Sequence, residues 1–288
     1  MSELSSDFLG AFFLGIVGGL LIWFGFQKGF FTKNPHPDWK PQTTLWHVCA
    51  GFGLYFAIVI FITPILAVIL QRKGLPQIAF ASWMNFLLSF SIFFALFLFW
   101  KSLPQKVRAP IWRAPDAHQT YSTDARFAVY TWCIAFPVAF AISQFLDTLM
   151  LYLFNLKELP DQLAVYFVKM SFQHPLYLFL AAISVVIFAP IVEEFLFRGL
   201  LQSFIRKHLG PQNAVLITSL CFSFFHFSGQ QGIANIPIIG SLFVFALFLG
   251  FLYEKQGSLF ASISLHALFN AISMINLYFF QDLPHGSL

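Results

Sequence analysis

The chain has 288 residues, of which 58% are hydrophobic and 10% are charged, and its mean hydropathy is +0.76. Soluble domains are typically about 45–50% apolar and about 25% charged, so this composition excludes a soluble globular protein and indicates an integral membrane protein. The net charge of +4 is spread over several loops, which argues against nucleic acid as a partner.

Eight segments are long and apolar enough to cross a bilayer, which takes about 20 mainly apolar residues per helix. In chain order they are residues 8–27, 44–70, 77–100, 127–155, 176–205, 213–229, 236–254 and 258–280. Proline and glycine separate most of them, and Gly210-Pro211 marks the turn between the fifth and the sixth. The predicted fold class is therefore all-α, a polytopic membrane protein with about eight transmembrane helices.

Most lysines and arginines fall in the loops after the odd-numbered segments, and Arg206 is assigned to one of these loops. Because cytoplasmic loops are rich in Lys and Arg, these loops, including residues 101–126, are expected in the cytosol and both termini outside it. The first segment follows an acidic and polar start, without a basic n-region, and it has no small-residue cleavage site, so we expect a retained helix. The expected location is a membrane, the inner (plasma) membrane if the source is bacterial.

The fifth segment contains Glu193, Glu194 and Arg198 in an otherwise apolar run. An ionised side chain deep in the bilayer costs about 3 kcal/mol on insertion scales, so such groups pair, face a wet cavity or take part in chemistry. On a helix, Glu194 and Arg198 share a face and can form an ion pair. Glu193 is rotated by about 100° from Glu194. The spacing predicts Glu193 as the free carboxylate, suited to general-base catalysis; a purely structural knot of the three charges is the alternative.

Polar side chains also lie in the sixth and the eighth segments. The sixth contains Phe222 and His226, and the eighth contains His266 and Asn270, which are four residues apart and share a face. A lone histidine such as His226 is more often structural, and His266 with Asn270 could be a packing contact between helices. Taken singly, each of these motifs is weak evidence for a functional site.

Their positions along the chain connect them. Glu193 lies 17 residues before Gly210 and His226 lies 16 residues after it, so an antiparallel hairpin would bring both to a similar depth. Glu193, His226, His266 and Asn270 would then converge from three helices, as in a hydrolase site. The carboxylate, assisted by His226, would activate water, and His266 with Asn270 would hold the oxyanion of a tetrahedral intermediate.

Three ordered motifs, each in an apolar segment, carry a resemblance to a known family: Glu193-Glu194-xxx-Arg198, Phe222-xxx-His226 and His266-xxx-Asn270. The chain resembles the CPBP family over about residues 175–280. This family includes the type II CAAX prenyl endopeptidases and the bacterial Abi-like membrane proteins. The resemblance implies an intramembrane endopeptidase of about eight helices.

The resemblance also implies roles for individual residues. Glu193 would be the catalytic carboxylate and His226 its partner, while His266 and Asn270 would stabilise the oxyanion. Supporting roles fall to Glu194, Arg198 and Phe222. The expected organisation is about four family-variable transmembrane helices in residues 1–170 and a CPBP/Abi-type protease core in residues 171–282. The expected partners are the lipid bilayer and a membrane-associated peptide or protein substrate, which the resemblance does not require to be prenylated.

The metal dependence of such a site is open at this level. Proteins of this family have been described both as metalloproteases and as glutamate-dependent proteases. The chain has no HExxH pair, yet Glu193, His226 and His266 could supply a three-ligand open zinc site. We favour the metal-free glutamate mechanism, with no cofactor, and keep zinc as the alternative.

Two other classes of function compete with the protease. A catalytically silent scaffold or immunity protein of the same fold would use the polar cluster only to fix helix packing. A transporter or channel would place Glu193, Glu194 and Arg198 on an ion path, but no inverted repeat is visible in the sequence.

Overall fold

The computed structural model describes residues 3–31, 36, 39–160 and 162–280. Residues 1–2 and 281–282, at the outer ends of the two predicted parts of the chain, lie outside the described residues. The elements in chain order are α1 (Glu3–Gln27), α2 (Leu45–Gln71), α3 (Gln77–Ser102), α4 (Gln105–Trp112), α5 (Tyr121–Phe154), α6 (Leu163–Ser171), α7 (Pro175–Ala182), η1 (Ile183–Phe188), α8 (Ala189–Glu194), η2 (Phe195–Gln202), α9 (Ser203–Phe225), η3 (Gly229–Ala234), α10 (Asn235–Gln256) and α11 (Leu259–Phe280). The described ranges contain helices and an isolated β-bridge between Arg113 and Ser258 but no strand, which confirms the all-α prediction.

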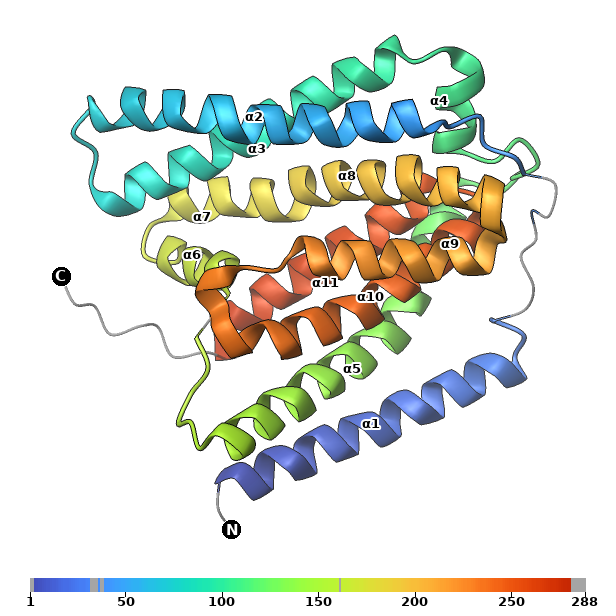
Figure 1. Cartoon of the computed structure of the whole chain (residues 1–288). Helices are drawn as coiled ribbons and strands as arrows, with labels where there is room; N and C mark the ends of the chain where they lie inside the picture. Colours follow the sequence, from blue (N-terminus) through green and yellow to red (C-terminus); the bar gives the residue numbers. More distant parts are fainter. Residues whose placement is uncertain (1–2, 32–35, 37–38, 161, 281–288) are drawn as a thin grey trace.

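Within the described part of the chain, seven segments are long and apolar enough to cross a membrane. The longest, Pro175–Phe225, has 51 residues, whereas one crossing takes about 20. It is interrupted at Gly210, whose φ of 80° and ψ of 168° are not helical and suit glycine because it has no Cβ. Figure 1 shows α9 running back antiparallel to α8 after this turn. This segment therefore supplies two of the eight predicted crossings, and the chain is a multi-pass integral membrane protein.

Two predicted boundaries are corrected by the structure. The fourth segment begins at Tyr121 rather than at residue 127, because the Thr120 side chain caps the helix by accepting a hydrogen bond from the Thr123 amide. The loop 101–126 is not continuous, since it contains α4, which buries Val107 and Ile111. The amphipathic stretch before Pro175 forms the short helix α6.

The rod that carries the two glutamates is not a uniform α-helix. It runs through α7, η1, α8 and η2 into α9, and η1 and η2 are π-helices. Pro190, in the first turn of α8, has no amide hydrogen and cannot complete a regular hydrogen-bond ladder. Membrane helices accommodate proline by such local π adjustments, and π segments occur frequently at functional sites. Glu193 and Glu194 thus lie between two π segments.

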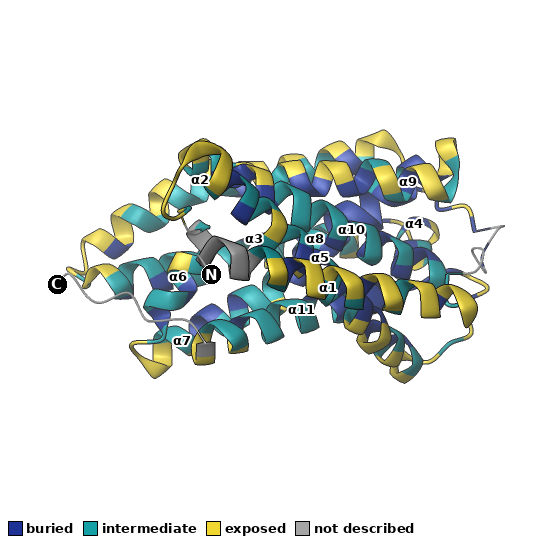
Figure 2. Cartoon of the chain, turned by 90° about the horizontal axis from the view of Figure 1, so that it is seen from below, coloured by how far each residue is buried: buried dark blue, intermediate teal, exposed yellow. Residues whose placement is uncertain are grey.

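The core and the lipid-facing surface are clearly separated. Figure 2 shows that exposed residues dominate α1, and these include large apolar side chains such as Phe12 and Trp23. The main hydrophobic cluster combines side chains of α2, α3 and α4 with side chains of the rod, α10 and α11. Helices from the first 170 residues therefore pack directly on the part of the chain that carries the polar motifs. The division into two parts at residue 170 stays a prediction.

Candidate active site

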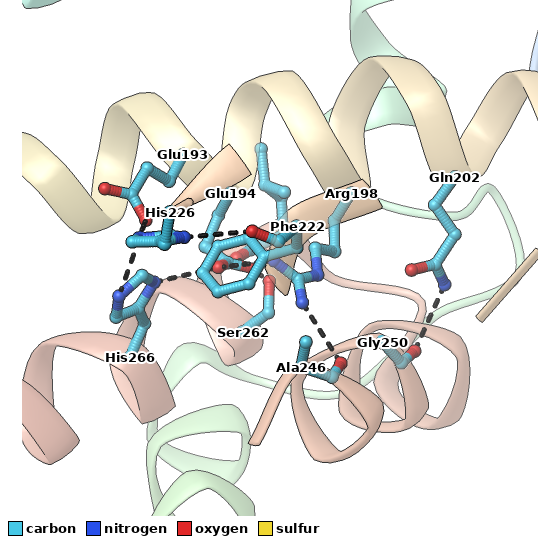
Figure 3. Close-up of polar contacts among 11 residues, drawn as sticks. Glu193, Glu194, Arg198, Gln202, Phe222, His226, Ala246, Gly250, Ser262 and His266 are labelled. Atoms are coloured by element: carbon cyan, nitrogen blue, oxygen red, sulfur yellow. Dashed lines mark hydrogen bonds and ion pairs between the residues drawn. The ribbon is translucent and has the colours of Figure 1, made fainter. Parts of the chain in front are cut away.

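Glu193, His226 and His266 meet at one point between α8, the end of α9 and α11 (Figure 3). Oε2 of Glu193 lies 3.9 Å from Nε2 of His226 and 3.9 Å from Nε2 of His266. This oxygen is buried and has no hydrogen-bond partner among the described residues. Direct hydrogen bonds span about 2.7–3.2 Å, so the gap is too wide for a direct hydrogen bond from Glu193 to either histidine.

The site is partly open to its surroundings. The side chains of Glu193 and His226 are 19% and 29% exposed, whereas that of His266 is 6% exposed. Tyr55 of α2 lies close enough to Glu193 for an electrostatic interaction between the two side chains. The site therefore has an exposed edge at His226 and a buried edge at His266.

His226 lies at the end of α9, which corrects the prediction that the sixth segment continues to residue 229. Its φ and ψ are −90° and 2°, and the chain leaves the helix because the Ser228 amide bonds to Oδ1 of Asn235 instead of continuing the ladder. Nδ1 of His226 lies 2.9 Å from the Phe222 carbonyl. A carbonyl can only accept, so Nδ1 carries the hydrogen, and Nε2 is directed at Glu193.

Glu194 holds the second histidine. Its side chain is fully buried, and Oε1 accepts a hydrogen bond from Nη1 of Arg198 at 3.0 Å, which confirms the ion pair predicted from the spacing. The same oxygen lies 2.9 Å from Nδ1 of His266. This second contact was not predicted. It fixes the orientation of the His266 ring and directs Nε2 toward Glu193.

Phe222 occupies the centre of the cluster. The Arg198 guanidinium carbon lies 4.6 Å from the centre of the Phe222 ring, a favourable cation–π distance. The ring centre is also 4.9 Å and 5.9 Å from the ring centres of His226 and His266. Figure 3 shows the ring between these side chains. Arg198 also donates from Nη2 to the Ala246 carbonyl of α10 at 3.0 Å. The Phe222 ring and Arg198 therefore connect the rod with α9, α10 and α11.

Asn270 lies one turn beyond His266, and its Nδ2 donates to the carbonyl of Val185 at 2.9 Å. In a π-helix each carbonyl accepts from the amide five residues later. For Val185 that residue is Pro190, which has no amide hydrogen. Asn270 therefore supplies the hydrogen bond that proline cannot. An asparagine amide has two N–H groups, so this contact leaves one of them for another acceptor.

Three further buried polar residues were not identified from the sequence. Nε2 of Gln202 donates to the Gly250 carbonyl and to Oε1 of Glu254, and Nε of Arg206 donates to Oε2 of Glu254 at 2.8 Å. Arg206 is buried, which corrects its assignment to a loop. The missed signal is a spacing of four residues that continues the Glu194 face: Glu194, Arg198, Gln202 and Arg206.

The donors of the site match zinc in chemistry but not in spacing. Zinc in a tetrahedral site has bonds of about 2.0–2.2 Å to nitrogen and oxygen ligands, which places neighbouring donors about 3.4 Å apart. Oε2 of Glu193 is 3.9 Å from each histidine Nε2. Among the residues that the structure describes, no group of three His, Cys, Asp or Glu side chains could hold a metal ion.

Residues 175–272 match the family model described as type II CAAX prenyl endopeptidase Rce1-like. The match begins at α7, ends within α11 and contains all three motifs, which confirms the predicted resemblance to the CPBP/CAAX protease family. No curated protein and no solved structure gives a match to the chain. The match supports a CAAX-type intramembrane protease fold for this part of the chain.

Proposed function

We propose that this chain, a member of the CPBP/CAAX protease family over residues 175–272, is an intramembrane endopeptidase that uses a glutamate-activated water. The proposal rests above all on one observation. Nε2 of His226 and Nε2 of His266 each lie 3.9 Å from Oε2 of Glu193, across one gap. A water in this gap would satisfy the buried carboxylate oxygen and would be polarised by it.

In the first step, Glu193 accepts a proton from the water while the water oxygen attacks the carbonyl carbon of the scissile peptide bond. His226 holds the water through Nε2, because its Nδ1 is engaged by the Phe222 carbonyl. General-base catalysis of this kind contributes about 10²–10⁴-fold.

The same attack turns the carbonyl oxygen into the negatively charged oxyanion of the tetrahedral intermediate. His266 and the remaining N–H of Asn270 donate to this oxyanion. For His266 the role requires hydrogen on both ring nitrogens, since Nδ1 already contacts Glu194. The intermediate collapses when the carbon–nitrogen bond breaks and the proton held by Glu193 passes to the leaving amine.

The proposed mechanism uses no metal ion. The distances of 3.9 Å from Oε2 of Glu193 to the two Nε2 atoms are longer than those between neighbouring ligands of tetrahedral zinc, which supports this part of the proposal. Metal analysis of the purified chain tests this part: we expect less than stoichiometric zinc and no change on His226→Ala. Stoichiometric zinc that is lost in His226→Ala would replace the glutamate mechanism by a metallo-mechanism.

The proposed function is tested in cells that carry the wild-type chain or Glu193→Gln at matched abundance. Mass spectrometry of membrane peptides and new N-termini is the measurement, and Glu158→Gln is the matched control, because Glu158 is exposed in a loop. We expect cleavage products with the wild type and with Glu158→Gln but not with Glu193→Gln. Identical products in all three would contradict proteolysis and favour a silent scaffold or immunity protein.

A further inference from the structure

A second concave feature of the chain lies on another face of the glutamate-bearing helix. A cavity of about 360 Å³ opens between α3, α4, the rod and α11, and small-molecule sites typically measure about 300–1,000 Å³. Its floor is made by buried apolar side chains that come from α3, the rod and α11: Leu96, Val192, Phe195 and Leu259. The lining is apolar throughout, so the cavity suits a hydrocarbon chain.

One end of the cavity is different, because it is lined by two indole rings and two cations lie over one of these rings. The rings of Trp100 and Trp112 line this end. Nζ of Lys101 lies 5.2 Å from the centre of the Trp100 ring, and the guanidinium carbon of Arg108 lies 5.8 Å from it. Nη1 of Arg108 also donates to the Lys101 carbonyl at 3.2 Å, which holds the guanidinium at this end.

Trp100 has an unused donor. Its indole N–H is buried and has no hydrogen-bond acceptor among the described residues, whereas the N–H of Trp112 donates to the Tyr121 hydroxyl at 3.1 Å. A buried N–H without an acceptor is unfavourable. An ester or phosphate oxygen of a bound amphiphile would supply that acceptor.

We infer that this cavity binds one anionic phospholipid, with an acyl chain on the apolar floor and the phosphate at Lys101 and Arg108. Basic pockets between membrane helices on the cytoplasmic side are the sites that bind anionic headgroups. Lys101 and Arg108 both lie within residues 101–126, the loop that the positive-inside rule assigns to the cytosol. Indole rings are favoured at the same depth, the membrane–water interface. This inference is independent of the proteolytic activity.

The test is native mass spectrometry of the purified full chain from bilayers that contain equal amounts of phosphatidylglycerol and phosphatidylcholine. We expect one phosphatidylglycerol retained per chain, preferred over phosphatidylcholine by about tenfold. Lys101→Ala/Arg108→Ala should abolish the preference. Ile263→Trp, which fills the cavity from α11, should prevent retention of both lipids.

Arg72→Ala/Lys73→Ala is the matched control, since it removes two exposed charges at the opposite end of α3. It should leave the lipid preference unchanged. Equal retention of the two lipids by the wild type would overturn the inference, because it would indicate ordinary boundary lipid. Retention that survives Ile263→Trp, or a lipidated peptide in place of the phospholipid, would also overturn it.

Discussion

Two clusters of buried charged side chains are built on the same rod, and they differ in how their carboxylates are hydrogen-bonded. The Glu193 cluster consists of Glu193, Glu194, Arg198, Phe222, His226 and His266. The Arg206 cluster consists of His36, Gln202, Arg206 and Glu254. In the Arg206 cluster both carboxylate oxygens of Glu254 accept hydrogen bonds, at 3.0 Å and 2.8 Å, and Nη2 of Arg206 donates to the His36 carbonyl at 2.6 Å. In the Glu193 cluster, Oε2 of Glu193 has no hydrogen-bond partner among the described residues, and it lies 3.9 Å from Nε2 of each histidine.

This difference separates a structural use of buried charge from a chemical one. A buried ion pair is tolerated when its hydrogen bonds are complete, and it is costly when one partner is removed. In the Arg206 cluster the ion pair of Arg206 with Glu254 meets that condition at both carboxylate oxygens, although Oε1 of Gln202 has no partner among the described residues, and the cluster joins His36 to α9 and α10. In the Glu193 cluster, Oε1 of Glu194 accepts from Arg198, whereas Oε2 of Glu193, Oε2 of Glu194 and Nε of Arg198 have no hydrogen-bond partner among the described residues. The side chains of Glu194 and Arg198 are fully buried and that of Glu193 is 19% exposed, so Glu193 is the carboxylate that a substrate or a water can reach. Substitutions in the two clusters should therefore affect different measurements.

The largest effect on activity is expected for Glu193→Gln. The amide cannot accept the proton of the water, so cleavage of the substrate should fall by about 10²–10⁴-fold. The side-chain volume is nearly unchanged, and we expect the thermal unfolding temperature to stay within about 2 °C of wild type. Parallel cleavage and unfolding assays check both. A stability loss as large as the loss expected for Glu254→Gln would make Glu193 a structural charge.

The largest effect on stability is expected for Glu254→Gln. It leaves the Arg206 guanidinium buried without its carboxylate, which should reduce the free energy of unfolding by about 3–5 kcal/mol. Cleavage per folded molecule should be unchanged, because Glu254 does not contact the three side chains at the gap. The measurement is unfolding in a mild detergent.

The double variant Arg206→Met/Glu254→Leu is the control for this comparison. It replaces both charges by apolar side chains of similar size and should recover most of the lost stability. If the double variant is as unstable as Glu254→Gln, packing rather than the uncompensated charge is the cause.

A third prediction divides the two roles of Asn270. Asn270→Ala removes the donor to the Val185 carbonyl and the proposed oxyanion donor together, so stability should fall by about 1–3 kcal/mol and cleavage by about 10²–10³-fold. Adding Pro190→Ala returns an amide hydrogen five residues after Val185. The stability should then recover while cleavage stays low. Recovery of both would indicate that Asn270 only supports the helix, and recovery of neither would indicate that the π segment needs the proline.

Much of the site can be predicted from sequence spacing, because the separation of two residues in a helix determines whether their side chains share a face. The ion pair of Glu194 with Arg198 follows from their separation of four residues, and the turn at Gly210 follows from a Gly-Pro pair between two apolar runs. The fold class and the number of crossings follow from composition and segment length. These are local rules, and they hold within one or two helices.

What the sequence did not predict depends on contacts between helices. The bond between Glu194 and His266 joins residues 72 positions apart, and no spacing rule links them. The end of α9 at His226 depends on Asn235 holding Ser228, which removes the amide that would continue the helix. Arg206 looked like a loop residue because it follows an apolar run, but the rod continues to Gly210 and Glu254 meets it from α10. The roles of the site residues in catalysis stay predictions.

The smallest effect tests the outer edge of the Arg206 cluster. Nδ1 of His36 lies 2.9 Å from Oδ1 of Asp116, and the Asp116 side chain is 47% exposed, whereas the His36 side chain is 3% exposed. Solvent screens the charges of such a pair, and an asparagine side chain at this position can still accept a hydrogen bond from His36. Asp116→Asn should therefore change the free energy of unfolding by less than about 1 kcal/mol. Cleavage should not change. A loss approaching the loss expected for Glu254→Gln would mean that the Arg206 cluster extends through His36 to Asp116 at the surface. His36 would then be held by its charged contact with Asp116 rather than by the hydrogen bond from Arg206 to its carbonyl. A small effect would confine the stabilising charge to Arg206 and Glu254, whose carboxylate accepts hydrogen bonds at both oxygens.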